Sequence, residues 1–257
     1  MARRIDLNAD LGEGTEAAHH ASDDAMLDLV SSANVACGGH AGDPDIMFRT
    51  LSNAARNGIA VGAHPGYADR VGFGRRVIPM ELDEIGRMVA AQIGALQAVA
   101  ALVPVKIAYV KTHGALANLA ARDADVAHAI VDTVQRIDPR LAVLAISGTE
   151  VERIARAEGV PVFSEIFADR GYQPNGQLVP RGEPGAMIHD AAEATERLLA
   201  FVETGLMPVV GGMPIPLEAD SICIHGDSPS AVAMARSVRA GLTDAGVELA
   251  SFVPAAP

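Results

Sequence analysis

The feature that most constrains this chain is one arrangement that occurs four times. In each case a short apolar run leads through a few small or turn-forming residues to a histidine. Such a run is typical of a buried strand, and a helical pattern follows each of the four. Parallel strands end on the same side of a sheet, so we expect these histidines to lie together on that side. The four histidines are His40, His64, His113 and His225.

Strand and helix patterns alternate along the whole chain. The predicted strands lie at about 4–9, 33–37, 59–63, 106–111, 141–146, 161–167 and 221–225. The predicted helices lie at about 22–30, 44–57, 81–102, 112–137 with a break near 122–123, from 149 onward, 187–204 and 228–245. Strict alternation indicates a parallel sheet. Polar residues end many strands and do not gather at one switch point, which favours a closed barrel over an open doubly wound sheet.

Local signals support several of these helix boundaries. Asp43 and Pro44 are typical of an N-cap and a first helical position, and Gly58 is typical of a helix end. Ser22, with two aspartates after it, predicts the start of the first helix. Thr149, with a glutamate three residues later, predicts a capping box. The fold class that we predict is α/β, as one seven-stranded parallel β/α barrel domain over residues 1–257.

Composition agrees with this fold and excludes several functions. Hydrophobic residues make up 49% of the 257 positions and aromatic residues only 4%, so the core consists mainly of Ala, Val, Leu and Ile. The net charge of −12, without a Lys/Arg cluster, argues against nucleic acid or an anionic membrane as a partner. No apolar run reaches the roughly 20 residues of a membrane span, and no signal segment is apparent. We therefore expect a cytoplasmic protein, with Cys37 and Cys223 as buried reduced thiols.

The first predicted strand leads into a dense group of polar residues. On a strand, residues 6, 8 and 10 point to one side, which would be the barrel interior. Asp6 can equally be part of a structural polar network or of a functional site. Asp10 and Glu13 lie at the barrel mouth and are candidate catalytic residues, and Asn8 is a candidate for substrate contact.

The second and third strands end in glycine-rich segments that contain histidines. Glycines around His40 and His64 allow the backbone to approach a ligand closely, and both histidines are candidate catalytic residues. Asp43 has a structural explanation as a helix cap, and a functional role is equally open. Arg75 lies in a later glycine-rich loop that suits an anionic or carboxylate ligand.

The later strands contribute further charged residues. Lys111 and His113 follow the fourth strand, and a lysine there needs an acidic partner or a substrate carboxylate. Arg181 belongs to the loop after the sixth strand, where Glu165, Asp169 and Arg170 also lie. His225 and Asp227 end the seventh strand. We predict His113 as catalytic, and Lys111, Arg75, Arg181, His225 and Asp227 as substrate-binding residues.

These residues permit two chemistries. Histidines and an aspartate from separate strands could hold a divalent metal that activates water. The candidate ligands are Asp10, His40, His64 and His113. Alternatively, the same groups could open an amide by acid/base catalysis without a metal. The other histidines, His19, His20, His128 and His189, have no comparable flanking pattern and are interpreted as ordinary surface or helix residues.

Six motifs together resemble the LamB/YcsF family and follow one another in the family's order over about residues 5–227. They are Asp6-Leu-Asn-Ala-Asp-Leu-Gly-Glu13, Asn34-Val-Ala-Cys-Gly-Gly-His-Ala-Gly-Asp-Pro44, Gly62-Ala-His-Pro-Gly-Tyr67 with Gly72-Phe-Gly-Arg-Arg76, Val110-Lys-Thr-His-Gly-Ala-Leu116, Phe167-Ala-Asp-Arg-Gly-Tyr172 with Leu178-Val-Pro-Arg181, and Ile222-Cys-Ile-His-Gly-Asp227.

The resemblance implies a barrel similar to the glycoside hydrolase/deacetylase superfamily. It also implies ATP-dependent opening of the lactam 5-oxoproline to glutamate, with ADP and phosphate formed, by the A component of 5-oxoprolinase together with partner subunits B and C. ATP would be a co-substrate, with Mg²⁺ held through the partners, because this chain has no Walker or GxGxxG motif. Two alternatives are a metal-dependent deacetylase or amidohydrolase and a non-catalytic scaffold subunit. The chain departs from the family pattern at Gly39, Thr112, Ala117 and after Gly14, which bears on substrate preference.

Overall fold

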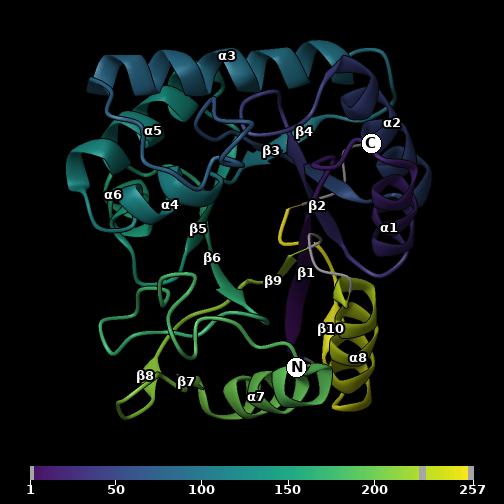
Figure 1. Cartoon of the computed structure of the whole chain (residues 1–257), viewed down its shortest axis with the longest axis vertical. Coiled ribbons are helices and arrows are strands. Elements are labelled where there is room, and N and C mark those ends of the chain that lie inside the picture. The colour runs from purple at the N-terminus through teal and green to yellow at the C-terminus, as the bar shows by residue number, and fades with distance from the viewer. Residues whose placement is uncertain (1–2, 226–229, 254–257) are drawn as a thin grey trace.

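A computed structural model describes residues 3–225 and 230–253. Seven parallel strands form a closed barrel with helices around it (Figure 1). The order around the barrel is β1-β2-β3-β4-β5-β6-β9, and β9 pairs back with β1. The barrel strands are β1 Arg4–Leu11, β2 Ser32–Ala36, β3 Ala60–His64, β4 Ile107–Val110, β5 Ala142–Ile146, β6 Val162–Phe167 and β9 Ser221–His225. The predicted seven-stranded α/β barrel is confirmed, with each predicted strand in place.

Eight helices in the described part of the chain connect and cover these strands. They are α1 Ala17–Leu27, α2 Pro44–Asn57, α3 Leu82–Ala100, α4 Gly114–Ala120, α5 Ala124–Ile137, α6 Glu150–Ala157, α7 Ala191–Thr204 and α8 Ala231–Asp244. The Asp43 carboxylate caps α2 by accepting from Ile46 N at 2.9 Å, and Gly58 ends the helix at φ 66°. The predicted break before α5 is also present, because Asp123 accepts from the first backbone N–H groups of that helix.

Two predicted helix starts are wrong, and one predicted capping box does not form. Helix α1 begins at Ala17 instead of Ser22, since Asp23 accepts from Gly12 N at 3.0 Å and does not cap the helix. Helix α6 begins directly after Thr149, as predicted, but the capping box does not form, because the Thr149 hydroxyl donates to the Ile146 carbonyl. Helix α7 starts at Ala191 instead of residue 187, since Asp190 is its N-cap. The predicted start of α8 at 228–229 lies outside the described residues.

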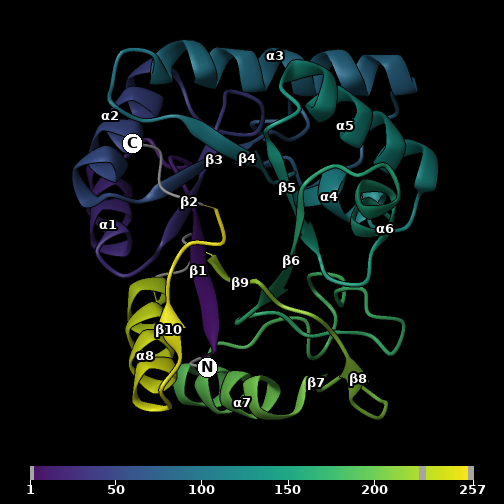
Figure 2. The same cartoon turned by 180° about the vertical axis from the view of Figure 1, so that it is seen from behind.

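Three short strands were not predicted. β10 (Glu248–Leu249) pairs with the beginning of β1, beside the barrel (Figure 2). β7 (Leu206–Met207) and β8 (Ile215–Pro216) form a small antiparallel pair after α7. Two-residue strands carry no periodic hydrophobic signal, which is why the sequence did not indicate them. Among the described residues, no helix is both long enough and apolar enough to cross a membrane.

The alternation along β1 separates the hydrophobic core from the polar interior of the barrel. Leu7, Ala9 and Leu11 are buried in the main hydrophobic core. Asp6, Asn8 and Asp10 are also buried, but they bond with polar groups from neighbouring strands. Hydrogen-bonded polar side chains therefore fill the barrel along this strand. We call the group around Asp6 the lower layer and the group around Asp10, at the carboxyl ends of the strands, the upper layer.

Candidate active site

A cavity of about 390 Å³ lies at the carboxyl ends of the strands, where β/α barrels carry their active sites. This volume is in the usual range for small-molecule sites. Eight of the eleven predicted site residues line the cavity: Asp10, Glu13, His64, Arg75, Lys111, His113, Arg181 and His225. Asn8 and His40 lie behind the cavity wall, and Asp227 lies outside the described residues.

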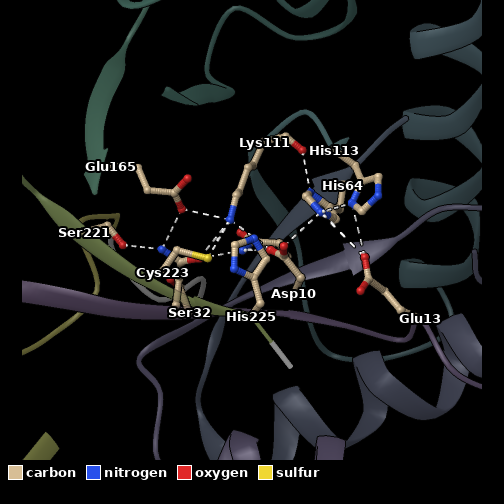
Figure 3. A network of polar contacts seen from close by, with 12 residues as sticks. Asp10, Glu13, Ser32, His64, Lys111, His113, Glu165, Ser221, Cys223 and His225 are labelled. Atoms are coloured by element: carbon tan, nitrogen blue, oxygen red, sulfur yellow. Dashed lines mark hydrogen bonds and ion pairs between the residues drawn. The ribbon is translucent and has the colours of Figure 1, made fainter. Parts of the chain in front are cut away.

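Lys111 is the centre of a buried polar network (Figure 3). Its Nζ lies 2.9 Å from Asp10 Oδ1 and 2.9 Å from Glu165 Oε1, and it also donates to Cys223 Sγ at 3.0 Å. Burial alone would lower the pKa of Lys111, but the carboxylate of Asp10 and the groups around it hold that pKa well above its usual value. Lys111 is therefore a fixed cation that is already paired with two carboxylates.

Two asparagines hold this network in place. Asn8 donates to Glu165 Oε1 at 2.9 Å, and its Oδ1 accepts from Asn34 Nδ2 at 2.7 Å. Asn34 also donates to Asp10 Oδ1 at 2.8 Å. Asn34 was not predicted as a site residue, although its position inside the second strand, in register with Asp10, could have indicated an inward polar side chain. Asn8, predicted to contact substrate, instead supports the residues that line the cavity.

Three imidazoles gather around the Glu13 carboxylate at the other side of Asp10. Glu13 Oε1 lies 2.8 Å from His40 Nε2 and 3.3 Å from His113 Nδ1. His64 Nε2 lies 3.3 Å from Asp10 Oδ2. Burial lowers the pKa of His40 to about 2 and that of His113 well below its usual value. These two rings are therefore neutral near pH 7, which is the form that can accept a proton or bind a metal.

The loop between β3 and α3 shapes this histidine cluster. Phe73 has a φ of 54°, which is unusual for a residue other than glycine, and its carbonyl accepts from His113 Nε2 at 2.9 Å. A Cβ at Gly74 would lie only 2.7 Å from His40 Cβ and 2.9 Å from His113 Cδ2. Glycine at this position therefore allows the loop to cover the two stacked rings.

A second acid/base pair lies beside Asp10, because His225 on β9 is in register with Asp10 on β1. His225 Nδ1 lies 2.9 and 2.8 Å from the two oxygens of Asp169, and its ring stacks on Phe167. Burial opposes protonation of His225, but the Asp169 carboxylate outweighs it and raises the pKa of the histidine. The cavity lining therefore combines a neutral imidazole, His113, with a more basic one, His225.

Arginines supply the positive charge of the cavity rim. Arg75, Arg170 and Arg181 all line the cavity. Arg170 is buried and donates to the carbonyls of Ala186 and Val179 at 3.1 and 2.7 Å, and burial lowers its pKa to about 10. Arg181 is exposed. These guanidinium groups suit an anionic part of a ligand.

The departures from the family pattern have different surroundings. Thr112 and Ala117 line the cavity, but Gly39 does not. A Cβ on Gly39 would lie 2.3 Å from Gln92 Oε1, so the Gln92 side chain fills that space. The histidines interpreted as ordinary lie away from the cavity lining, and His128 forms an exposed ion pair with Glu158.

Two groups of described residues have the chemistry and spacing to hold a metal ion. One consists of Glu13, His40, His64 and His113, and the other of Asp10, Cys223 and His225. In each group the possible ligand atoms lie within 4.8 Å of one another. Asp10 touches the first group as well, through its contact with His64.

Comparison with known proteins identifies relatives along nearly the whole chain. The sequence model of the LamB/YcsF family matches residues 5–256. A protein of Gluconobacter oxydans, named as the A component of 5-oxoprolinase, is 50% identical over 96% of this chain and 97% of its own length. A protein of the same name from Azorhizobium caulinodans is 48% identical over 97% of this chain and 99% of its own.

Solved structures give the same result for the fold. A "Lactam Utilization Protein" from Thermus thermophilus superposes with a TM-score of 0.88 at 43% identity, over 97% of this chain and all of its own. The catalytic domain of a peptidoglycan N-acetylglucosamine deacetylase from Eubacterium rectale superposes with a TM-score of 0.54 at 9% identity, over 100% of this chain and 91% of its own. The latter likeness concerns the barrel fold alone.

Proposed function

Because the chain belongs to the LamB/YcsF family, we propose that it is the A component of a 5-oxoprolinase. The reaction is the ATP-dependent cleavage of 5-oxoproline to L-glutamate, with formation of ADP and phosphate. The observation that carries this proposal is the near-full-length similarity, in both directions, to proteins named as A components of 5-oxoprolinase. The cavity supports it with acid/base groups and cations that suit a small cyclic amide with a carboxylate.

The substrate carboxylate is best matched by the arginine rim. Lys111 was expected as one candidate, but Asp10 and Glu165 already pair with its ammonium group. Arg75 and Arg181 line the same cavity and carry guanidinium forks that fit a carboxylate. We assign the carboxylate to these arginines and assign to Lys111 the role of fixing the orientation of Asp10.

The lactam ring would then lie against Asp10 and His225, which are neighbours on β1 and β9 and both line the cavity. Asp10, Glu13, His64 and His113 line the cavity, and His225 lines it next to Asp10. Ring opening needs one group that directs the attack of the nucleophile on the ring carbonyl and another that protonates the ring nitrogen as it leaves. We assign the first role to the Asp10 side, and the second to His225, whose pKa Asp169 raises.

ATP and partner subunits complete the proposal. Loss of amide resonance makes a lactam resistant to hydrolysis, so coupling to ATP is chemically reasonable. The sequence has no recognisable nucleotide-binding motif, which supports a complex in which subunits B and C take part in the ATP chemistry with Mg²⁺. ATP is available in the cytoplasm, the location expected from the sequence.

A metal-dependent amidohydrolase is the second candidate. It is favoured by the group of possible metal ligands around Glu13 and His64. Such an enzyme would cleave an amide in the isolated chain without ATP. A scaffold role has less support, because organising partners does not require buried ionisable groups that converge on a cavity.

The test is reconstitution with purified B and C subunits of a 5-oxoprolinase. We expect glutamate and ADP in equal amounts from 5-oxoproline and ATP, only when all three subunits are present. Omission of ATP or of this chain should abolish glutamate release. Lactam opening by the isolated chain without ATP would contradict the proposal and favour the amidohydrolase. ATP-dependent glutamate release that does not need this chain would support neither the 5-oxoprolinase component nor the amidohydrolase.

A further inference from the structure

The hydrogen bonds of two histidines determine which ring nitrogens carry a proton. His64 Nδ1 lies 2.8 Å from the carbonyl oxygen of Lys111, and His113 Nε2 lies 2.9 Å from that of Phe73. A carbonyl oxygen only accepts hydrogen bonds, so both of these nitrogens must donate. In neutral rings the other nitrogens, His64 Nε2 and His113 Nδ1, therefore carry lone pairs. These two nitrogens lie 3.0 Å apart and face each other.

Two carboxylates direct further lone pairs at the same point. Asp10 Oδ2 lies 3.3 Å from His64 Nε2, and Glu13 Oε1 lies 3.3 Å from His113 Nδ1 and 3.8 Å from His64 Nε2. Acceptor atoms of four side chains thus converge on one small volume (Figure 3). A cation between them would turn this arrangement from repulsive to attractive.

The spacing fits a metal ion. A tetrahedral zinc site with bonds of about 2.0–2.1 Å places its ligand atoms roughly 3.3 Å apart. Four of the six separations among these atoms are 3.0, 3.3, 3.3 and 3.8 Å, which are distributed around that value. The rings of His64 and His113 are nearly perpendicular, at 88°, so both can direct an in-plane lone pair at one ion.

His40 is arranged as a support and not as a ligand. Its ring stacks on that of His113 with centroids 3.6 Å apart and 3° between the planes. Two parallel stacked rings cannot both direct in-plane lone pairs at one ion. His40 Nε2 instead lies 2.8 Å from Glu13 Oε1, and the residue does not line the cavity. Donation from His40 to Glu13, and from the two ligand histidines to carbonyls, is the outer-shell pattern typical of metal sites.

We propose that Asp10, Glu13, His64 and His113 bind one divalent transition-metal ion of the zinc type at the wall of the cavity, with His40 positioning Glu13. Mixed imidazole and carboxylate ligands suit such an ion better than Ca²⁺ or Mg²⁺. All four ligand residues line the cavity, so the ion is accessible to a small molecule bound there. This inference rests on the geometry of these side chains and does not depend on the proposed reaction.

The test is metal binding by the isolated full chain, without substrate or partners. The protein is first treated with a strong chelator and then titrated with Zn²⁺ against a chromophoric chelator at pH 7.5. We expect one Zn²⁺ per chain, and an affinity reduced by about 100-fold or more in His64→Gln and in His113→Gln. His40→Gln should lose about 10- to 100-fold, as outer-shell substitutions do. His128→Gln, which changes an exposed histidine on α5, is the matched control and should bind as the unchanged protein does.

A second measurement does not depend on whether the variants fold. Co²⁺ added to the unchanged protein should give the intense visible absorption of a four-coordinate site at one equivalent, and Zn²⁺ should abolish it. If a shared proton instead fills the space between the histidines, neither metal will bind stoichiometrically, and the proposal is overturned. It is equally overturned if folded His64→Gln and His113→Gln proteins bind Zn²⁺ as tightly as the unchanged chain. Stoichiometric binding without glutamate release in the reconstituted system would contradict only the proposed function.

Discussion

Asp6 and Asp10 lie on the same strand and the same side of it, yet their surroundings are of different kinds. Asp6 accepts from the hydroxyls of Ser31 and Ser32 at 2.6 and 2.7 Å, and from that of Ser221. Burial raises its pKa to about 6. These three partners are neutral hydroxyl groups, and Asp6 does not line the cavity. This lower layer is a hydrogen-bonded network inside the barrel, and Asn8 joins it to the network around Lys111 by donating to Ser221.

Asp10 is one layer higher and has charged and titratable partners. Burial opposes its ionisation, but His64 and Lys111 outweigh that effect and hold the pKa of Asp10 well below its usual value. One oxygen bonds with Lys111 and Asn34, and the other faces His64 and the cavity. The comparison teaches that the identity of an inward aspartate does not determine its role. Its neighbours do, as does its distance from the carboxyl end of the strand.

The largest expected effect is on stability and comes from Lys111→Met. The change removes the cation that pairs with Asp10 and Glu165 and leaves two buried carboxylates close together. We expect a loss of about 3–5 kcal/mol in the free energy of unfolding. For a protein of this size that corresponds to a melting temperature lower by roughly 10 °C. Thermal unfolding followed by circular dichroism measures it.

Lys106→Met is the matched control, since it makes the same chemical change at an exposed lysine just before β4. It should alter stability by no more than about 0.5 kcal/mol. In a Glu165→Gln background, Lys111→Met should cost less, because only one unpaired carboxylate remains. Similar melting temperatures for Lys111→Met and Lys106→Met would mean that the stability of the upper layer does not depend on the Lys111 ammonium group.

A smaller effect concerns Asp6 and pH. Its folded-state pKa of about 6 is above the ordinary value of 3.8, so the folded protein binds this proton more tightly than the unfolded chain does. The stability that protonation provides is complete below about pH 4 and is lost as pH rises to about 6. Relative to Asp6→Asn, the unchanged protein should therefore lose up to roughly 3 kcal/mol between pH 4 and pH 7.

Urea unfolding of both proteins at several pH values measures this difference. The nearby titratable groups, Glu165 and Tyr109, are present in both proteins, so their contributions cancel to first order. If the two stability curves run parallel from pH 4 to pH 7, the hydroxyl network stabilises the ionised form of Asp6 at least as strongly as burial opposes it, and the pKa of Asp6 is not raised.

Much of the fold could be predicted from the sequence because apolar runs, caps and glycines act locally. All seven barrel strands and the break before α5 followed from such signals. The errors arose where a side chain with capping chemistry bonds elsewhere, as Asp23 does with Gly12. No pattern in one segment shows which partner from a distant segment will compete for that side chain.

The site could be predicted only in part, for the same reason. Strand ends placed eight predicted residues at the cavity, since the barrel topology brings those ends together. The sequence did not show that two carboxylates occupy Lys111 or that His40 lies behind Glu13. Both facts depend on packing between β1, the end of β4, β6 and the loop after β2. The position of Asn34 in the second strand could indicate an inward polar side chain, but no local signal shows that its partners are Asn8 and Asp10.

The most direct test of the difference between the two layers is the turnover of Asp10→Asn beside that of Asp6→Asn. Both changes preserve side-chain volume, and in Asp10→Asn Glu165 still pairs with Lys111. ATP-dependent glutamate release would be measured in the reconstituted three-subunit system, with thermal unfolding as the control for folding. We expect Asp10→Asn to lose about 100-fold or more in turnover, and Asp6→Asn to stay within about threefold of the unchanged protein. Unchanged turnover in Asp10→Asn, or equal losses in both variants, would contradict the assignment of chemistry to the upper layer.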